Sequence, residues 1–460
     1  MSPQTTPGQT QSKSIKAAGD LDPGFGVDGL VNIPNPEAPN AFLYISAVTT
    51  NPTTDTDNAL YVGCWLNETY IVRLLQDGQI DTSFGSAGYA KLPKGEPTNH
   101  SLNVGSFIFL ETGNVIGLGS IHIQESGYNL NVPAAVGFTS DGIIDTSFGD
   151  GGISIFRLHL PTPESAPRQT STNEKYEPSP YLNSDIHKAH RNGHTDASQG
   201  VRLADGKLLF VGSTYYSNSP ILVAAYLIRI NADGSLDTSF GQNGSVVIRQ
   251  FEGNDTHNTF FGFDRQNRVF IAGNPALIPF PASIVRYDAE GNIDTGFGNS
   301  GVVHITLTDS PGSQAMGMIV LDDGKVIVLA NFFKDAFSPA TTAVVQLSPS
   351  GTPDPEFNNG EPVSIVLTQG GTFAGSTISK DEGNRIIISG SREKPGETSS
   401  GCMVRLMPNG QLDTGFGSNG TAVFERFETV DLTTIQNRVN VVTASSDIVS
   451  LEGLLFRIIG

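Results

Sequence analysis

One eleven-residue motif recurs seven times along this chain of 460 residues, and the repetition constrains the fold more than any other feature. Its form is G-x-[LI]-D-[TP]-x-F-G-x-x-G, as in GQIDTSFGSAG (78–88) and GQLDTGFGSNG (410–420). Successive motif aspartates lie 59, 64, 92, 57, 60 and 59 residues apart. A unit of about 60 residues repeated in this way is typical of a closed or stacked array.

The motif residues have structural explanations. The aspartate precedes Thr or Pro, and its carboxylate can accept backbone N–H groups in an Asx-turn. The phenylalanine is expected to fill apolar space between sheets. Seven equivalent copies argue against a catalytic or calcium-binding role, because an active site needs one place. In the sixth copy Asn358 replaces a glycine, and an altered turn is expected there. We assign to the structural repeat Asp22, Asp81, Asp145, Asp237, Asp294, Asp354, Asp413, Phe25, Phe84, Phe148, Phe240, Phe297, Phe357 and Phe416.

Four short β runs fill each unit between motifs. In the fifth unit they are 315–321, 325–330, 342–347 and 362–367. Short runs that are rich in β-branched residues and separated by Gly turns indicate strands, and no segment has a sustained helical period. Four strands repeated seven times predict an all-β fold, a seven-bladed β-propeller with four-stranded antiparallel blades.

The two ends of the chain carry complementary parts of one unit. The C-terminal run GLLFRIIG (453–460) resembles a third run and lacks the motif and fourth run that should follow it. Residues 19–33 supply that motif and a fourth run, LVNI. We therefore expect the N- and C-terminal strands to pair and close the ring.

The repeat divides the chain into a polar lead-in (1–18), expected to be disordered, and a single propeller (19–460). One unit carries an insertion over 159–198, between the second and third units. The lead-in lacks an apolar segment, so no Sec signal peptide is predicted. A cytoplasmic location, or export without a cleavable signal, is expected. No run of 18 apolar residues predicts a membrane span.

The chain is acidic, with a net charge of −19. A nucleic-acid-binding protein is expected to present a basic patch, because neutralised phosphates supply most of the affinity. No such patch is visible in the sequence, so nucleic acid is excluded as a partner.

The insertion holds a cluster of metal-ligand types: Asp185, His187, His190 and His194. On a helical turn the three histidines would share a face, and with the carboxylate they could hold Zn²⁺. If the segment holds a metal, Zn²⁺ or Ca²⁺ is expected. The alternative is a flexible polar loop with exposed histidines and no cofactor.

The variable loops are the second candidate site. Loops that join one unit to the next, and loops between second and third runs, share one face, which we call the variable loop face. Aromatic side chains there could bind protein or glycan, or they could anchor the loops on neighbouring blades. The aromatic residues assigned to this binding face are Trp65, Tyr128, Tyr215, Tyr216, Phe280, Phe332 and Phe333.

The motif resembles the bacterial delta-60 repeat, a DUF5122-type β-propeller repeat, over residues 19–460. The resemblance implies a bacterial propeller, often on secreted or surface proteins, and it implies no catalytic residues. A non-enzymatic scaffold that binds a macromolecular partner through the variable loop face is therefore favoured. The alternatives are a glycan-active hydrolase or lyase near residues 185–194, and a structural module of a larger assembly.

Overall fold

A computed structural model gives the structure of residues 20–50, 59–92, 94–95, 100–125, 128–158, 200–216, 222–248, 257–274, 281–334, 340–367, 370–381, 383–424, 429–435, 439–445 and 453–458. The predicted lead-in (1–18) and insertion (159–198) lie outside these residues, and both stay predictions.

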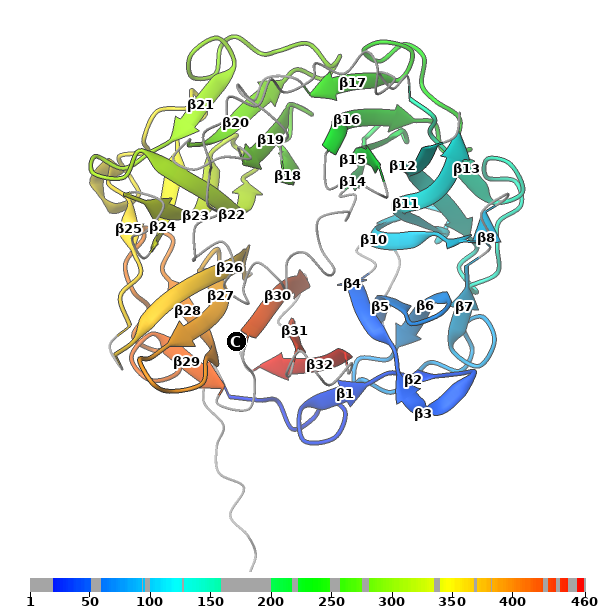
Figure 1. Ribbon diagram of the computed structural model, residues 1–460, viewed down its shortest axis with the longest axis horizontal. Helices are drawn as coiled ribbons and strands as arrows, with labels where there is room; N and C mark the ends of the chain where they lie inside the picture. Colours follow the sequence, from blue (N-terminus) through cyan, green and yellow to red (C-terminus); the bar gives the residue numbers. More distant parts are fainter. Residues whose placement is uncertain are drawn as a thin grey trace, which may run out of the picture.

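The strands form a ring of antiparallel sheets around a common centre (Figure 1). The chain is thus an all-β propeller with four-stranded blades. Five sheets have four strands each, and the strands are given in their order from the centre of the ring outward. The first sheet has β4 (Tyr44–Thr50), β5 (Leu60–Trp65), β6 (Thr69–Leu74) and β7 (Tyr89–Lys91). Three more sheets have β18 (His257–Phe263), β19 (Val269–Asn274), β20 (Ala282–Tyr287) and β21 (Val302–Ile305); β22 (Gly312–Val320), β23 (Val326–Phe333), β24 (Thr341–Leu347) and β25 (Val363–Ser364); and β26 (Thr372–Lys380), β27 (Ile386–Glu393), β28 (Ser400–Leu406) and β29 (Thr421–Phe424).

The terminal sheet joins the two ends of the chain. It contains β30 (Thr429–Ile435), β31 (Val439–Ser445), β32 (Gly453–Ile458) and β1 (Leu30–Asn32). Strand β1 pairs antiparallel with β32, and Val31 lies opposite Leu455. Both side chains are buried in one apolar cluster with Phe25. The expected closure of the ring by its terminal strands is therefore present.

The expected count of seven blades is wrong, because two repeats share one sheet. Five four-stranded sheets and one eight-stranded sheet make six blades, rather than seven, in the described ring. The eight-stranded sheet, here the double sheet, contains β10 (Asn103–Phe109), β11 (Val115–Glu125), β12 (Tyr128–Phe138), β13 (Ile153–Ile155), β14 (Gly200–Arg202), β15 (Leu208–Tyr216), β16 (Leu222–Ile230) and β17 (Ser245–Ile248).

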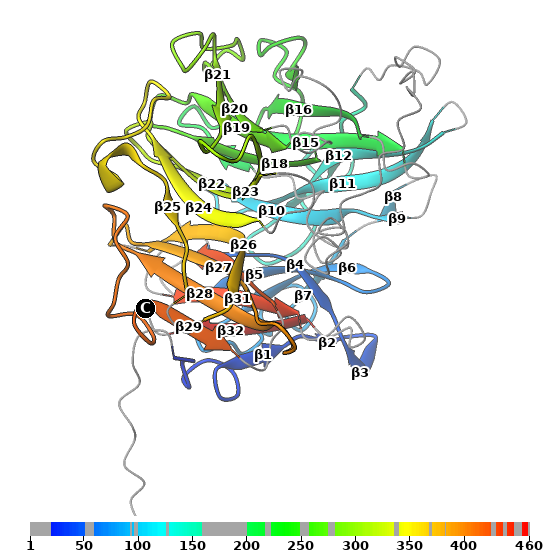
Figure 2. The same cartoon turned by 60° about the vertical axis from the view of Figure 1, so that its left-hand side comes forward.

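Long strands explain this junction. Strands β12 and β15 have 11 and 9 residues, against 6 in β5 or β19. They continue past their own repeats, and Leu130 then pairs with Tyr216 while Asn131 pairs with Tyr215. Figure 2 shows β11, β12 and β15 reaching outward together on one side of the ring.

The motif phenylalanines lie in the core between neighbouring sheets, as predicted. All seven are at most 2% exposed. Phe240, for example, packs in one cluster with Leu227 of its own sheet and Ile271 of the next. The motif backbone also crosses between neighbouring repeats, because the Gly85 N–H donates to the Asp141 carbonyl oxygen over 2.7 Å. Apolar strands such as β23 are buried throughout because sheets cover them on both sides.

A tight turn ends each motif. Six copies have a two-residue turn with positive φ at both positions, as at Ala87 (φ 53) and Gly88 (φ 97). Positive φ at both central positions matches the twist of a hairpin. In the sixth copy a short 3-10 helix, η1 (Asn358–Gly360), takes its place. The altered turn expected there is confirmed.

Two short hairpins are added to the ring between its larger sheets. They are β2 (Pro34–Asn35) with β3 (Ala38–Phe42), and β8 (Lys94–Gly95) with β9 (His100–Ser101). Each lies in a connection from one repeat to the next, so both belong to the variable loop face. Within the described ranges, no helix is long and apolar enough to cross a membrane.

Candidate functional site

The repeated aspartates hold the motif turns together. In all seven copies the aspartate Oδ1 accepts the N–H of the residue two positions later, over 2.8–3.2 Å. The carbonyl oxygen of the same aspartate accepts the N–H of the motif phenylalanine. This is the predicted Asx-turn, and it fixes the backbone on both sides of the aspartate.

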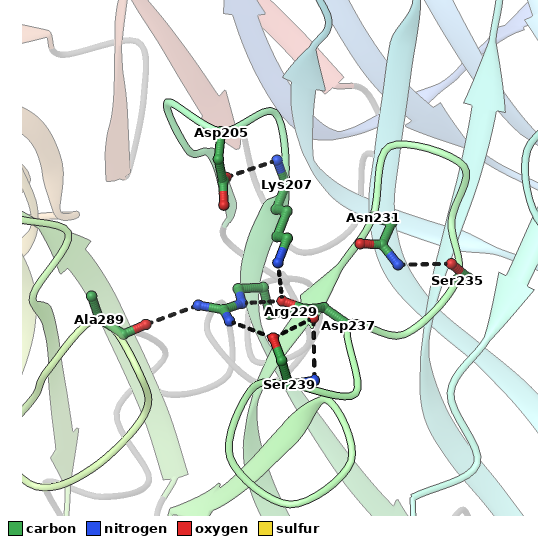
Figure 3. Close-up of polar contacts among 8 residues, drawn as sticks. All are labelled: Asp205, Lys207, Arg229, Asn231, Ser235, Asp237, Ser239 and Ala289. Carbon is green, nitrogen blue, oxygen red and sulfur yellow. Dashed lines mark hydrogen bonds and ion pairs between the residues drawn. The ribbon is translucent and has the colours of Figure 1, made fainter.

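Asp237 shows how such a carboxylate is neutralised (Figure 3). Its Oδ2 lies 2.6 Å from Arg229 Nε and 2.8 Å from Lys207 Nζ, and its Oδ1 accepts the Ser239 hydroxyl over 2.7 Å. The Arg229 guanidinium also donates to the Ala289 carbonyl oxygen in the next sheet. Burial alone would raise the pKa of Asp237, but the bonds from Lys207, Ser239 and Arg229 outweigh it and hold that pKa well below its ordinary value.

Other copies place different partners around the same carboxylate. At Oδ2, Asp81 contacts Arg73 at 3.2 Å, Asp145 contacts Asn114 at 2.9 Å, Asp294 contacts Arg286 at 2.8 Å, Asp354 contacts Gln346 at 2.6 Å and Lys325 at 2.9 Å, and Asp413 contacts Arg405 at 2.8 Å. A general base needs a pKa near the working pH and access to a substrate proton. These carboxylates are instead occupied by the protein itself, which supports their structural role.

Trp65 is partly exposed on the variable loop face. It ends β5, and its ring stacks on Tyr44 at the start of β4, with centroids 4.8 Å apart and planes inclined by 24°. Tyr44 was not among the binding residues predicted from the sequence. Its place directly opposite Trp65 follows from the pairing of β4 with β5.

The other aromatic candidates divide into three groups. Tyr128, Tyr215 and Tyr216 lie at the strand ends near the β12–β15 junction. Phe280 lies outside the described residues. Phe332 and Phe333 are 1% and 6% exposed, so the expectation that they present rings to a partner is wrong. Strand β23 continues through both residues, and Phe332 therefore pairs with both β22 and β24.

Polar contacts that were not predicted from the sequence fix the β2–β3 hairpin to the first sheet. The Tyr89 hydroxyl donates to the Pro34 carbonyl oxygen over 2.9 Å. Lys91 Nζ lies 2.6 Å from a Glu37 carboxylate oxygen and 3.4 Å from one of Glu68. The hydrogen bond from Lys91 lowers the pKa of Glu37. Three prolines and two asparagines in residues 34–40 were the available signal for this turn.

The predicted metal ligands Asp185, His187, His190 and His194 lie outside the described residues. In the part of the chain that is described, no three His, Cys, Asp or Glu side chains gather as a metal site would require. One histidine there faces a hydroxyl group, since His304 Nδ1 lies 2.8 Å from Ser283 Oγ across β20 and β21. Ser283 is 6% exposed, so its hydroxyl is not open to a substrate.

A family comparison agrees with this architecture. A family model described as "Domain of unknown function (DUF5122) beta-propeller" matches residues 57–84, 203–240, 321–357 and 384–416. The match covers four separate segments of the chain, each in a different repeat. Each match ends on a motif phenylalanine, namely Phe84, Phe240, Phe357 or Phe416. The expected resemblance is thus confirmed for four repeats.

Solved structures with a similar fold are distant in sequence. The chain is similar to a polysaccharide lyase, an ulvan lyase, with 10% identity, 97% and 96% of the two chains covered and a TM-score of 0.47. It is also similar to the β-propeller domain of the Trilobed protease from Pyrococcus furiosus, with 8% identity, 90% and 93% coverage and a TM-score of 0.42. A protein of unknown function from Dyadobacter fermentans has 12% identity, 83% and 100% coverage and a TM-score of 0.40. At these values the likenesses carry no functional information. No curated protein matches the chain.

Proposed function

We propose that this protein is a non-enzymatic scaffold that binds a macromolecular partner through its variable loop face. The observation that carries the proposal is the stacked pair of Trp65 and Tyr44 on that face. Both rings are partly exposed. Partly exposed Trp and Tyr are the residue types that contribute most to binding in protein interfaces.

The setting of this pair supports a preformed surface. Tyr44 follows the β2–β3 hairpin directly, and Tyr89 and Lys91 fix that hairpin to the first sheet. A ligand would therefore meet rings whose supporting backbone is already in place, which reduces the entropy lost on binding.

A scaffold is favoured over a glycan-active enzyme because of how the carboxylates of the repeats are used. The motif aspartates are turned inward to their own turns and cations, as Asp237 is to Lys207 and Arg229. A glycosidase or lyase would need acid and base groups that face a substrate. The catalytic alternative at residues 185–194 remains a separate hypothesis, which activity assays on polysaccharides test.

Substitution of Trp65 tests the proposal. A partner is first isolated from the native source on the immobilised protein, and its Kd is then measured with purified components. We expect Trp65→Ala to raise Kd by about 30-fold, as for a residue central to an interface. Gln411→Ala, in an exposed turn on the opposite face, is the matched control and should leave Kd unchanged. Equal affinity of the two variants, or polysaccharide cleavage by the purified protein, would contradict the proposal.

A further inference from the structure

Three consecutive repeats expose apolar side chains on the face opposite the variable loop face. Val27 is 77% exposed, Leu75 is 38% exposed and Ile143 is 64% exposed. All three lie in the short turns around the motif. We call the strip formed by these three residues the apolar arc.

The fold itself does not require apolar residues at these positions. Val27 and Leu30 flank a two-residue turn and exchange backbone hydrogen bonds. In another turn, the carbonyl oxygen of Ile143 accepts the N–H of Thr139. The same hydrogen bonds identify the equivalent residues in other repeats. At the position of Val27 these are Ser86, Asp150, Gln242, Asn299 and Ser418. At the position of Ile143 they are Gln79, Ser235, Asn292, Thr352 and Gln411.

Every equivalent residue in those two sets is polar, while the turns keep the same backbone hydrogen bonds. At the position of Leu75, four of the other described copies have a polar residue, and the fifth has Met407. Water-exposed apolar groups that do not serve the fold indicate a surface that is covered by a partner.

Backbone hydrogen bonds between neighbouring repeats hold the turns of the arc side by side. The Gly26 N–H, next to Val27, donates to the Asp77 carbonyl oxygen over 2.6 Å, and Asp77 lies in the turn that follows Leu75. The Gly85 N–H of that repeat donates to the Asp141 carbonyl oxygen over 2.7 Å, two residues before Ile143. The three exposed side chains thus lie on adjoining turns of one surface.

The charge of the arc restricts its partner. Segments 20–29, 75–88 and 139–152 contain no Lys, Arg or His. They expose the carboxylates of Asp28, Asp77, Asp141 and Asp150 between the apolar side chains. An acidic partner would be repelled, and so would a second copy of this chain, whose net charge is −19.

We propose that the apolar arc is a docking surface for a basic segment of another protein in which apolar side chains alternate with Lys or Arg. The apolar side chains of the segment would cover Val27, Leu75 and Ile143, and its cations would meet the surrounding aspartates. This surface lies on the opposite face from Trp65, so the inference is independent of the proposed function.

Repeat-derived substitutions provide the test. The triple variant Val27→Ser, Leu75→Asn, Ile143→Gln takes its residues from Ser86, Asn231 and Gln79, which occupy the same turns elsewhere in the ring. Val366→Ser is the matched control, because Val366 is 79% exposed but lies in a connection on the variable loop face. Fluorescence anisotropy measures the binding of three labelled peptides of equal length, in which Lys alternates with Leu, Lys with Ser, or Glu with Leu.

We expect the Lys/Leu peptide to bind the parent protein, and the triple variant to raise its Kd at least about 10-fold, since three apolar contacts are lost. Val366→Ser should leave Kd unchanged, and both other peptides should bind more weakly. If the Lys/Ser peptide bound as tightly as the Lys/Leu peptide, binding would be due to non-specific charge attraction alone, and the inference would be overturned. An unchanged Kd in the triple variant, or concentration-dependent self-association that this variant abolishes, would also overturn it.

Discussion

The ring of Phe240 packs against Gly291 of the next sheet, where an added Cβ atom would lie 2.9 Å from the ring. The φ of Gly291 is +89°, so this glycine serves both the turn and the contact. Phe84 stands in the same relation to Gly142, and Phe297 to Gly351. Each motif phenylalanine of this kind therefore links its own repeat to the turn of the next one.

Substitution of Gly291 separates these two roles. Gly396→Ala is the matched control, because Gly396 has a φ of +80° but nothing within 4 Å of its added Cβ. The control should cost about 1–2 kcal/mol in free energy of unfolding, from the backbone alone. Gly291→Ala should cost about 1–3 kcal/mol more, since the Phe240 ring and a methyl group of Val246 must also move. Equal costs in denaturant titration would contradict the account of the contact.

Removal of the phenylalanine ring tests the core between the sheets. Phe240 is fully buried, so Phe240→Ala should lower the free energy of unfolding by about 3–5 kcal/mol. Phe263→Ala is the control. Because Phe263 is 37% exposed, this substitution should lower the free energy of unfolding clearly less. Denaturant titration measures both. A loss below about 1 kcal/mol for Phe240→Ala would refute its assigned role.

Acid should weaken the fold through Asp237. Its pKa is lower in the folded state than the value of about 4 in the unfolded chain. The ionised Asp237 therefore contributes to the free energy of unfolding above about pH 4, and this contribution is lost as pH falls toward the folded pKa. Unfolding titrations below pH 5 should show a flatter pH dependence for Asp237→Asn than for the parent, and Lys207→Gln should lie between them. Parallel curves would show that this network does not couple stability to pH.

The histidines of the insertion carry a separate prediction. If residues 185–194 hold a metal, His187→Ala and His190→Ala should each reduce the Zn²⁺ or Ca²⁺ that elemental analysis detects in the purified protein. His304→Ala should leave the metal content unchanged, because His304 is engaged with Ser283. Absence of metal from the parent protein, purified without chelator, would leave only the flexible-loop alternative.

Local chemistry explains which parts of the fold could be predicted from sequence. The Asx-turn at Asp237, the burial of Phe240 and the altered turn at Asn358 depend on residues within one motif, and all three were predicted. Closure was also predictable, because the residues near Val31 carry the strand that the repeat ending at Leu455 lacks.

Features that depend on strand length escaped prediction. The motif spacing does not reveal that β12 and β15 continue far enough for Asn131 to pair with Tyr215, so the double sheet was missed. Phe332 was assigned to an exposed loop for the same reason, since the strand end was placed too early. Tyr44 was missed because only strand pairing places it beside Trp65.

Thermal unfolding of two truncated proteins tests the closed ring most directly. A chain that begins at residue 34 lacks β1, Asp22 and Phe25, and it leaves β32 as an exposed sheet edge. A chain that begins at residue 16 keeps all of them. We expect the shorter chain to aggregate or to unfold at a clearly lower temperature, while the longer one unfolds as the parent does. Coincident unfolding curves for the two truncated proteins would contradict closure of the ring by β1.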